Sequence, residues 1–244
     1  MTAPTLPSSY GDTYRQMLSS VASAPRLHNS KLAAFWPMCG VDYEPGKGML
    51  LIGRATNGWD PQFMLRDGGR ADELERIVTE ASNPTSGMEW VTKLAGAAKQ
   101  ADGSNRYNTN LSAFWRTAHH VAEQCGLVRQ PESWSNSLAW SNLYKLSPGG
   151  GGDPTGAQCE AQLEHCCRLL KLEMEAFQPA VVLVVTGLDW WEPFNAALGY
   201  PTQPHEGECV LATGRGTAKW VVTSRPEYRP GSAFVSEVCQ ALAN

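Results

Sequence analysis

The sequence predicts an α/β fold, a three-layer α/β/α sandwich around a central, mostly parallel sheet of four strands. Three neighbouring features predict it. Residues 180–186 (AVVLVVT) are fully apolar, as in a central strand that helices cover on both faces. A long amphipathic helix precedes this strand. A glycine loop and a short apolar strand that ends at Asn142 precede the helix. Such a strand-helix-strand unit joins two parallel strands by a right-handed crossover.

The first elements along the chain are a helix and a strand. Apolar residues at helical spacing predict a helix over 10–24, whereas the polar residues 1–9 are expected to fray. A turn rich in glycine and proline over 45–48 then leads into a strand over 49–53.

The long segment 59–137 is predicted to contain helices and no strand. The helices are expected over 71–81, 87–99 and 110–124. His119 and His120 lie on the third of them. Neighbours on a helix point about 100° apart and no ligand-type partner follows four residues later, so no metal site is predicted.

The second half of the chain supplies the other strands. The second strand is expected over 138–143, the third over 180–186 and the fourth over 218–223. A strand over 208–212 precedes the fourth, and a helix over 231–242 closes the chain. Trp190 and Trp191 begin a short helix, where packing in the core is favoured over stacking on bases.

The glycine run 149–152 separates the second strand from the long helix. It lacks the order of a phosphate-binding P-loop and precedes Thr155, which can cap the helix. A loop at the edge of a substrate site and a plain linker both remain open for this run.

Composition limits the class of protein. A chain of 244 residues with 42% hydrophobic content can bury one sizeable core, so a single domain over 1–244 is predicted. Its net charge of −4 gives no general attraction for nucleic acid. A local patch of Arg215, Lys219, Arg225 and Arg229 could supply that attraction, or could be an ordinary solvated rim.

Cysteine usage and the amino terminus suggest a location. The seven cysteines include no C-x-x-C pair, which favours buried, reduced thiols over a disulfide framework or a zinc site. The amino terminus lacks a signal-peptide pattern, and no apolar run is long enough to span a bilayer. We therefore expect a cytoplasmic protein without a membrane partner; the oligomeric state is not determined.

Three segments carry a family resemblance. Residues 140–145 (WSNLYK), with the following loop, the helix containing Cys166 and the strand in QPAVVLVVTG, resemble the second motif region of uracil-DNA glycosylases, closest to the iron-sulfur branch. Residues 50–60 (LLIGRATNGWD) resemble the first, water-activating motif, and residues 221–230 (VVTSRPEYRP) resemble the carboxyl-terminal His-Pro motif. The resemblance implies the same α/β/α sandwich and cleavage of the N-glycosidic bond of a base extruded from DNA, or of a related nucleoside.

The resemblance also implies roles for single residues. Asn142 matches the asparagine that reads the edge of the base, although a strand-end asparagine can also serve a turn. Arg54 stands where the iron-sulfur branch has a glutamate and cannot act as a base, so Asn57 or Asp60 would orient the water. Arg225 replaces the motif histidine; it could stabilise an anion but transfers no proton.

Further substrate contacts are expected from Gly53, Arg54, Gly58, Trp59, Lys145 and Arg229. Because strand-end loops of a parallel sheet share one edge, these side chains are expected to converge on one crevice. Turn chemistry also explains Gly, Asn and Asp in the loop after the first strand. Leu146 follows Lys145 and no amino-terminal cysteine pair is present, so no iron-sulfur cluster and no other cofactor are predicted.

Two classes of function follow from these motifs. One is a glycosylase-like enzyme, or a nucleic-acid-binding protein derived from such an enzyme. The other is a non-catalytic α/β module that binds a ligand or a partner, because the two catalytic motifs are altered and a fold does not imply a function. A hydrolase with a serine or cysteine nucleophile ranks last, because the G-x-S-x-G pattern is missing from the sequence.

Overall fold

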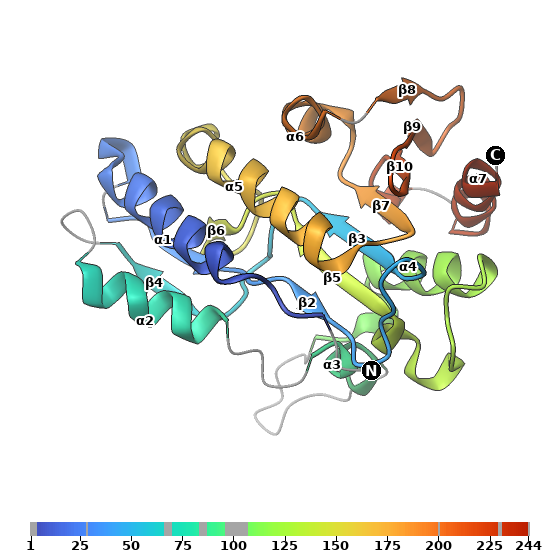
Figure 1. The fold of residues 1–244 in the computed structure, drawn as a ribbon, viewed down its shortest axis with the longest axis horizontal. Helices are drawn as coiled ribbons and strands as arrows, with labels where there is room; N and C mark the ends of the chain where they lie inside the picture. The colour runs from blue at the N-terminus through green and yellow to red at the C-terminus, as the bar shows by residue number, and fades with distance from the viewer. Residues whose placement is uncertain are drawn as a thin grey trace.

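The computed structural model describes residues 4–27, 29–65, 70–82, 87–95, 107–199, 201–228 and 231–243. Their fold is mixed α/β, with a seven-stranded sheet and a three-stranded sheet (Figure 1). The larger sheet has the strand order β2-β5-β3-β7-β10-β9-β8. Its strands are β2 Met38–Cys39, β3 Met49–Gly53, β5 Leu138–Asn142, β7 Val181–Val185, β8 Thr202–Pro204, β9 Val210–Arg215 and β10 Lys219–Thr223.

Four strands of this sheet, β5, β3, β7 and β10, run parallel to one another. Met49 of β3 pairs with Leu138 of β5 and with Val181 of β7, and Lys219 of β10 pairs with Val181 as well. These are the four strands that the sequence predicts, and each observed end lies within one residue of the predicted one.

The expected extent of the sheet is wrong, because antiparallel strands lengthen it at both edges. β2 pairs with β5 at one edge, and β9 and β8 follow β10 at the other. Strands of two or three residues, such as β2 and β8, are too short to show a period of two in a sequence. Tertiary pairing rather than local pattern creates them.

A smaller antiparallel sheet packs beside the larger one. It consists of β4 Gln62–Met64, β1 Lys31–Ala34 and β6 Leu146–Pro148. Leu32 of β1 pairs with Phe63 on one side and with Pro148 on the other. The prediction that 59–137 contains no strand is therefore wrong, since β4 lies within it.

Helices surround the two sheets. The α-helices are α1 Ser8–Ser23, α2 Ala71–Ala81, α3 Glu89–Lys93, α4 Ala113–Gln124, α5 Gly156–Phe177, α6 Leu188–Leu198 and α7 Gly231–Ala243. Short 3-10 turns occur at η1 Pro25–Leu27, η2 Thr109–Leu111, η3 Pro131–Ser137 and η4 Pro226–Tyr228. Thr155 caps α5 through a reciprocal pair of hydrogen bonds with Gln158, as the sequence predicts.

Some helix boundaries differ from expectation. α1 begins at Ser8 and Leu6 packs against the core, so the expected fraying of 1–9 is wrong for these residues. α3 ends at Lys93, and part of the helix predicted over 87–99 lies outside the described residues. The helix predicted over 110–124 is divided, because Ser112 ends η2 and caps α4.

The parallel strands are buried on both faces. Leu50 and Ile52 of β3 belong to one apolar cluster, which α1, α2, α5 and α6 complete. Met49 and Leu51 of the same strand belong to a second cluster, which α3, α4 and α7 complete. Alternate residues of one strand thus face two different helical layers. Figure 1 shows α1 and α5 side by side over one face.

The structure also bears on membranes and thiols. No helix in the described part of the chain is long and apolar enough to cross a bilayer. The seven cysteines are not joined by disulfides in the structure, and Cys39, Cys125, Cys159 and Cys239 are half-buried rather than buried as expected.

Candidate functional site

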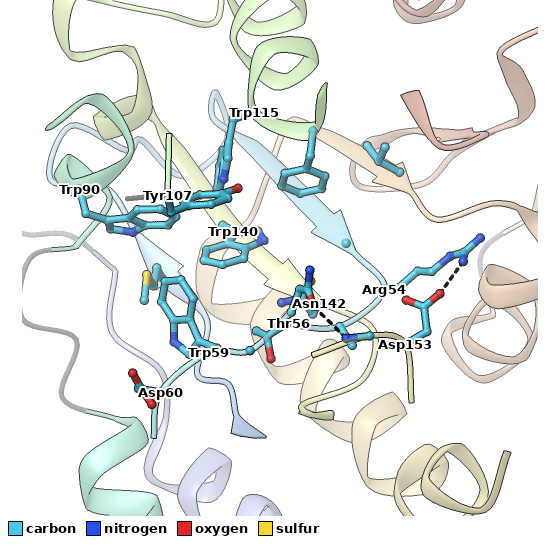
Figure 2. A pocket seen from close by; sticks show the side chains of 18 of the residues that line it. Arg54, Thr56, Trp59, Asp60, Trp90, Tyr107, Trp115, Trp140, Asn142 and Asp153 are labelled. Carbon is cyan, nitrogen blue, oxygen red and sulfur yellow. Dashed lines mark hydrogen bonds and ion pairs between the residues drawn. The ribbon is translucent and has the colours of Figure 1, made fainter. Parts of the chain in front are cut away.

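A cavity of about 910 Å³ lies at the carboxyl ends of the parallel strands (Figure 2). Gly53 ends β3, Asn142 ends β5, Val185 ends β7, and Arg225 follows β10; all four line the cavity. Open α/β sheets bind ligands at this edge. The cavity brings together these predicted site residues: Gly53, Arg54, Asn57, Gly58, Trp59, Asp60, Asn142 and Arg225. Lys145 is not among them, and Arg229 lies outside the described residues.

Asn142 lies beside the end of β3, because the parallel register pairs it with Gly53. A Cβ atom at residue 53 would collide with Asn142 Oδ1, so the close approach requires glycine there. The Asn142 residue is 2% exposed, and its Nδ2 has no hydrogen-bond partner among the described residues. Leaving such a donor unpaired costs about 1–3 kcal/mol. An acceptor on a ligand in the cavity would remove that cost.

The loop after β3 forms the rim of the cavity. Its Asn57, Gly58 and Asp60 are exposed. The backbone N–H of Gly152 donates to Asn57 Oδ1 at 2.8 Å, which ties the glycine loop to this rim. The glycine run was interpreted either as a loop at the edge of a site or as a plain linker. Its position beside the cavity fits the first interpretation. Asp60 makes no ion pair with another described residue.

The two arginines of the cavity are paired with carboxylates. Arg54 Nη1 lies 2.8 Å from Asp153 Oδ2, and Arg54 Nε donates to the carbonyl of Thr186 at 2.8 Å. Arg225 Nη1 lies 3.8 Å from the same Asp153 oxygen, and Arg225 Nη2 donates to Glu227 at 2.9 Å. Partial burial raises the pKa of Glu227, but the hydrogen bond from Arg225 outweighs it and holds this pKa below its usual value. Each guanidinium therefore already has a counter-charge.

The opposite wall of the cavity is a cluster of four tryptophans from four separate segments: Trp59, Trp90, Trp115 and Trp140. The ring of Trp59 lies 5.3 Å from those of Trp90 and Trp140, and the ring of Trp115 lies 5.1 Å from that of Trp140. Figure 2 shows this cluster on one side of Asn142 and the Arg54–Asp153 pair on the other. The buried indole N–H groups of Trp90 and Trp140 have no hydrogen-bond partner among the described residues.

No protein-family model matches this chain, and no curated protein matches it either. The site is therefore defined by its geometry. Sequence reasoning missed Trp90 and Trp140 as cavity residues. The nine tryptophans of the chain are a signal of composition, but their positions on α3 and β5 match an ordinary core pattern. Their approach to Trp59 arises from tertiary packing.

Lys145 does not line the cavity, although a substrate contact is expected for it, because its side chain is buried inside the protein. Lys145 and Glu173 are 0% exposed, and Lys145 Nζ lies 2.8 Å from Glu173 Oε1. Lys145 Nζ also donates to Ser141 Oγ at 2.8 Å and to the carbonyl of Asn142 at 2.5 Å. Tyr10 OH donates to Glu173 at 2.7 Å. These four side chains form a buried network that supports the backbone of Asn142 from inside the protein.

The expected basic patch is not continuous with the cavity. Lys219 begins β10, whereas the cavity lies past the other end of this strand, about 13 Å away for a strand of this length. Arg215 and Lys219 line a different cavity, and Lys219 Nζ donates to the carbonyl of Leu242. A strand separates these two cations from Arg225 because residues at its two ends face opposite edges of the sheet.

The remaining candidates pack against other aromatic or charged side chains. Trp191 is fully buried and its ring lies 5.1 Å from that of Trp220, in a tilted arrangement, in agreement with the core interpretation. Trp190 lies below the guanidinium of Arg54, 4.7 Å from its ring centroid, and supports that side of the cavity. His119 stacks on Trp134, and burial lowers its pKa. The described residues contain no group of three metal-ligating side chains.

Proposed function

We propose that this protein is a uracil-DNA glycosylase-like protein that binds an extruded nucleobase in the cavity and hydrolyses its N-glycosidic bond. The observation that carries the proposal is the unpaired amide of Asn142, buried at the end of β5 and part of the cavity wall. A carboxamide offers both a donor and an acceptor, which is what the edge of a nucleobase requires.

The arrangement of strands and helices supports the same proposal. Four parallel strands with helical layers on both faces fit a three-layer α/β/α sandwich of the kind that the superfamily resemblance implies. The added antiparallel strands lie at the edges of the sheet, away from the central strand ends that form the cavity. They do not change the end of β3, which lies between β5 on one side and β7 on the other. Open α/β sheets bind ligands at such a point, where the order of the strands reverses.

Hydrolysis needs a group that holds the attacking water. Four carboxylates line the cavity, and three of them are in ion pairs: Glu80 with Arg76, Asp153 with Arg54, and Glu227 with Arg225. Asp60 is the fourth, and makes no such pair within the described part of the chain. We assign the role of water activation to Asp60, since Asn57 already accepts a hydrogen bond from Gly152.

Release of free base from oligonucleotides that contain uracil, hypoxanthine or xanthine tests the proposed activity. Asp60→Asn should lower the rate by about 10²–10⁴-fold, as for loss of a general base. Asn142→Ala should weaken binding of the same strands. Asp72→Asn, which removes an exposed carboxylate of α2, serves as the control and should behave as the wild type. Base release that survives both cavity substitutions would refute the assignment.

Binding without cleavage is the second candidate. Its support is that Arg54 and Arg225 are already paired with carboxylates, so neither guanidinium is poised to stabilise a departing anion. Such a protein would hold a base in the cavity as a non-catalytic module. Binding that depends on Asn142, together with no release of any base, would select this candidate.

A further inference from the structure

The charge of the cavity lining differs from that of a site for anions. Its described part carries four carboxylates and two guanidiniums, and each guanidinium is paired with a carboxylate of the same lining. Asp60 lies beside Trp59, on the tryptophan side of Asn142 in Figure 2. The uncompensated charge near the aromatic wall is therefore negative.

The aromatic wall favours a positive charge as well. Indole has the most electron-rich face among the aromatic side chains, and a desolvated cation over it is attracted by the ring quadrupole. Here four indoles line the cavity and pack together, with ring centroids 5.1–5.7 Å apart for the pairs that include Trp140. A flat cation would gain both stacking and this electrostatic attraction, whereas an anion would meet repulsion from ring faces and from Asp60.

We infer that the base this cavity accepts is cationic: a purine that carries an extra alkyl group on a ring nitrogen and therefore a formal positive charge. The inference rests on the proposed function and specifies its substrate. Asn142 contacts the edge of the base, the tryptophans stack on its face, and Asp60 balances its charge.

The size of the cavity agrees with a purine. Pockets of about 300–1,000 Å³ hold drug-sized molecules, and this cavity lies near the upper limit of that range. A bicyclic base with its sugar uses more of this volume than a pyrimidine does.

The chemistry of such a base matches the altered third motif. Water attacks C1′ of the sugar and forms the new C–O bond, while the C1′–N bond breaks and its electron pair returns to the ring nitrogen. The cationic base thereby leaves as a neutral molecule, and the proton lost by the water passes to the carboxylate of Asp60. No acid is needed at the leaving base, so the lack of a proton donor at Arg225 is no obstacle.

A matched pair of nucleosides tests the inference. The ring of 7-methylguanosine is cationic at mildly acidic pH, whereas 7-deaza-7-methylguanosine has the same shape and no charge. Binding is followed by quenching of the fluorescence of the cavity tryptophans. We expect the cationic nucleoside to bind about tenfold or more tightly than the neutral one. Asp60→Asn should remove most of this preference, and the control Asp72→Asn should keep it.

The outcomes separate this inference from the proposed function. Equal binding of the two nucleosides, with dependence on Asn142, would overturn the inference and leave nucleobase binding intact. A preference for the cation that survives Asp60→Asn and Trp59→Leu would also overturn it. Binding of neither nucleoside would reject both. Release of 7-methylguanine from methylated DNA, lost in Asp60→Asn, would extend the inference to turnover.

Discussion

Two buried polar groups at the end of β5 differ in their partners. Asn142 and Lys145 lie three residues apart, and both are almost fully excluded from solvent. Lys145 is paired with Glu173 and donates two further hydrogen bonds, whereas Asn142 Nδ2 has no partner among the described residues. Both residues carry the motif resemblance, yet one serves the interior and the other faces the cavity.

The difference shows how to separate a structural polar residue from a binding one. A buried charge is tolerated when an opposite charge and hydrogen bonds surround it, which is the case for Lys145. A buried donor without a partner is a free-energy cost that a native protein seldom keeps without a reason. For Asn142, the ligand that we propose would supply that reason. Substitutions in the buried network of Lys145 should therefore lower stability more than ligand binding. Substitution of Asn142 should lower ligand binding more than stability.

Lys145→Met should have the largest effect on stability. It leaves the carboxylate of Glu173 buried without its cation, which costs about 3–5 kcal/mol of unfolding free energy. Lys171→Met removes an exposed lysine from the same helix as Glu173 and should be close to neutral. Urea denaturation measures both. An unchanged stability with lost ligand binding would show that Lys145 belongs to the site after all.

Ser141→Ala and Asn142→Ala compare neighbours on the same strand. Ser141 Oγ accepts from Lys145 and donates to Glu173 at 2.5 Å, so its loss should cost about 1.5–3 kcal/mol. Asn142→Ala should cost less than about 1 kcal/mol, because no hydrogen bond of Nδ2 is lost. Ligand titration should show the reverse order. Equal losses of stability in the two variants would contradict the proposed difference between the network of Lys145 and Asn142.

Tyr10→Phe and Tyr14→Phe compare a charged acceptor with a neutral one. Both tyrosines are fully buried on α1; Tyr10 donates to Glu173 and Tyr14 to the carbonyl of Phe35. Burial, together with Glu173, raises the pKa of Tyr10 well above its ordinary value, so it remains a neutral donor. We expect losses of about 1.5–3 kcal/mol for Tyr10→Phe and about 0.5–1.5 kcal/mol for Tyr14→Phe. Thermal melts of both variants under the same conditions measure these losses. A larger loss for Tyr14→Phe than for Tyr10→Phe would contradict the prediction.

Glu227→Gln should have the smallest effect. The pKa of Glu227 is lower in the folded protein than in the unfolded chain, so its stabilisation is present above the unfolded value of about 4.3. That contribution disappears as the pH falls through the folded pKa. Because the pair with Arg225 is partly exposed, the loss at neutral pH should be below about 1 kcal/mol. In urea melts, the difference in unfolding free energy between variant and wild type should therefore shrink as the pH is lowered stepwise below about 4.3.

Local pattern predicted much of the fold. β3 and β7 are short runs of apolar residues that a sequence displays directly, and Thr155 is followed by Gln158 at the spacing of a helix cap. β1, β4 and β6 were not predicted. Strands of three or four residues have too few positions to show a period, and β6 exists because β1 pairs with it.

The candidate site was predicted in part for a similar reason. Residues at the ends of parallel strands share an edge, so Asn142 and Arg225 could be placed on one cavity from strand positions alone. Lys145 was misplaced because the direction of its side chain depends on Glu173, which lies 28 residues further along the chain. The tryptophan cluster was missed because its members come from a loop, two helices and a strand.

The sequence by itself determined the parallel strands, their order along the chain and the edge at which polar side chains gather, because these depend on periodicity and on chain direction. The tertiary structure alone decided which polar groups are satisfied. Hydrogen-bond partners such as Lys145 and Glu173 are distant in sequence, and only folding brings them together. The same packing buries Asn142 Nδ2 without one, although Asn142 lines the cavity.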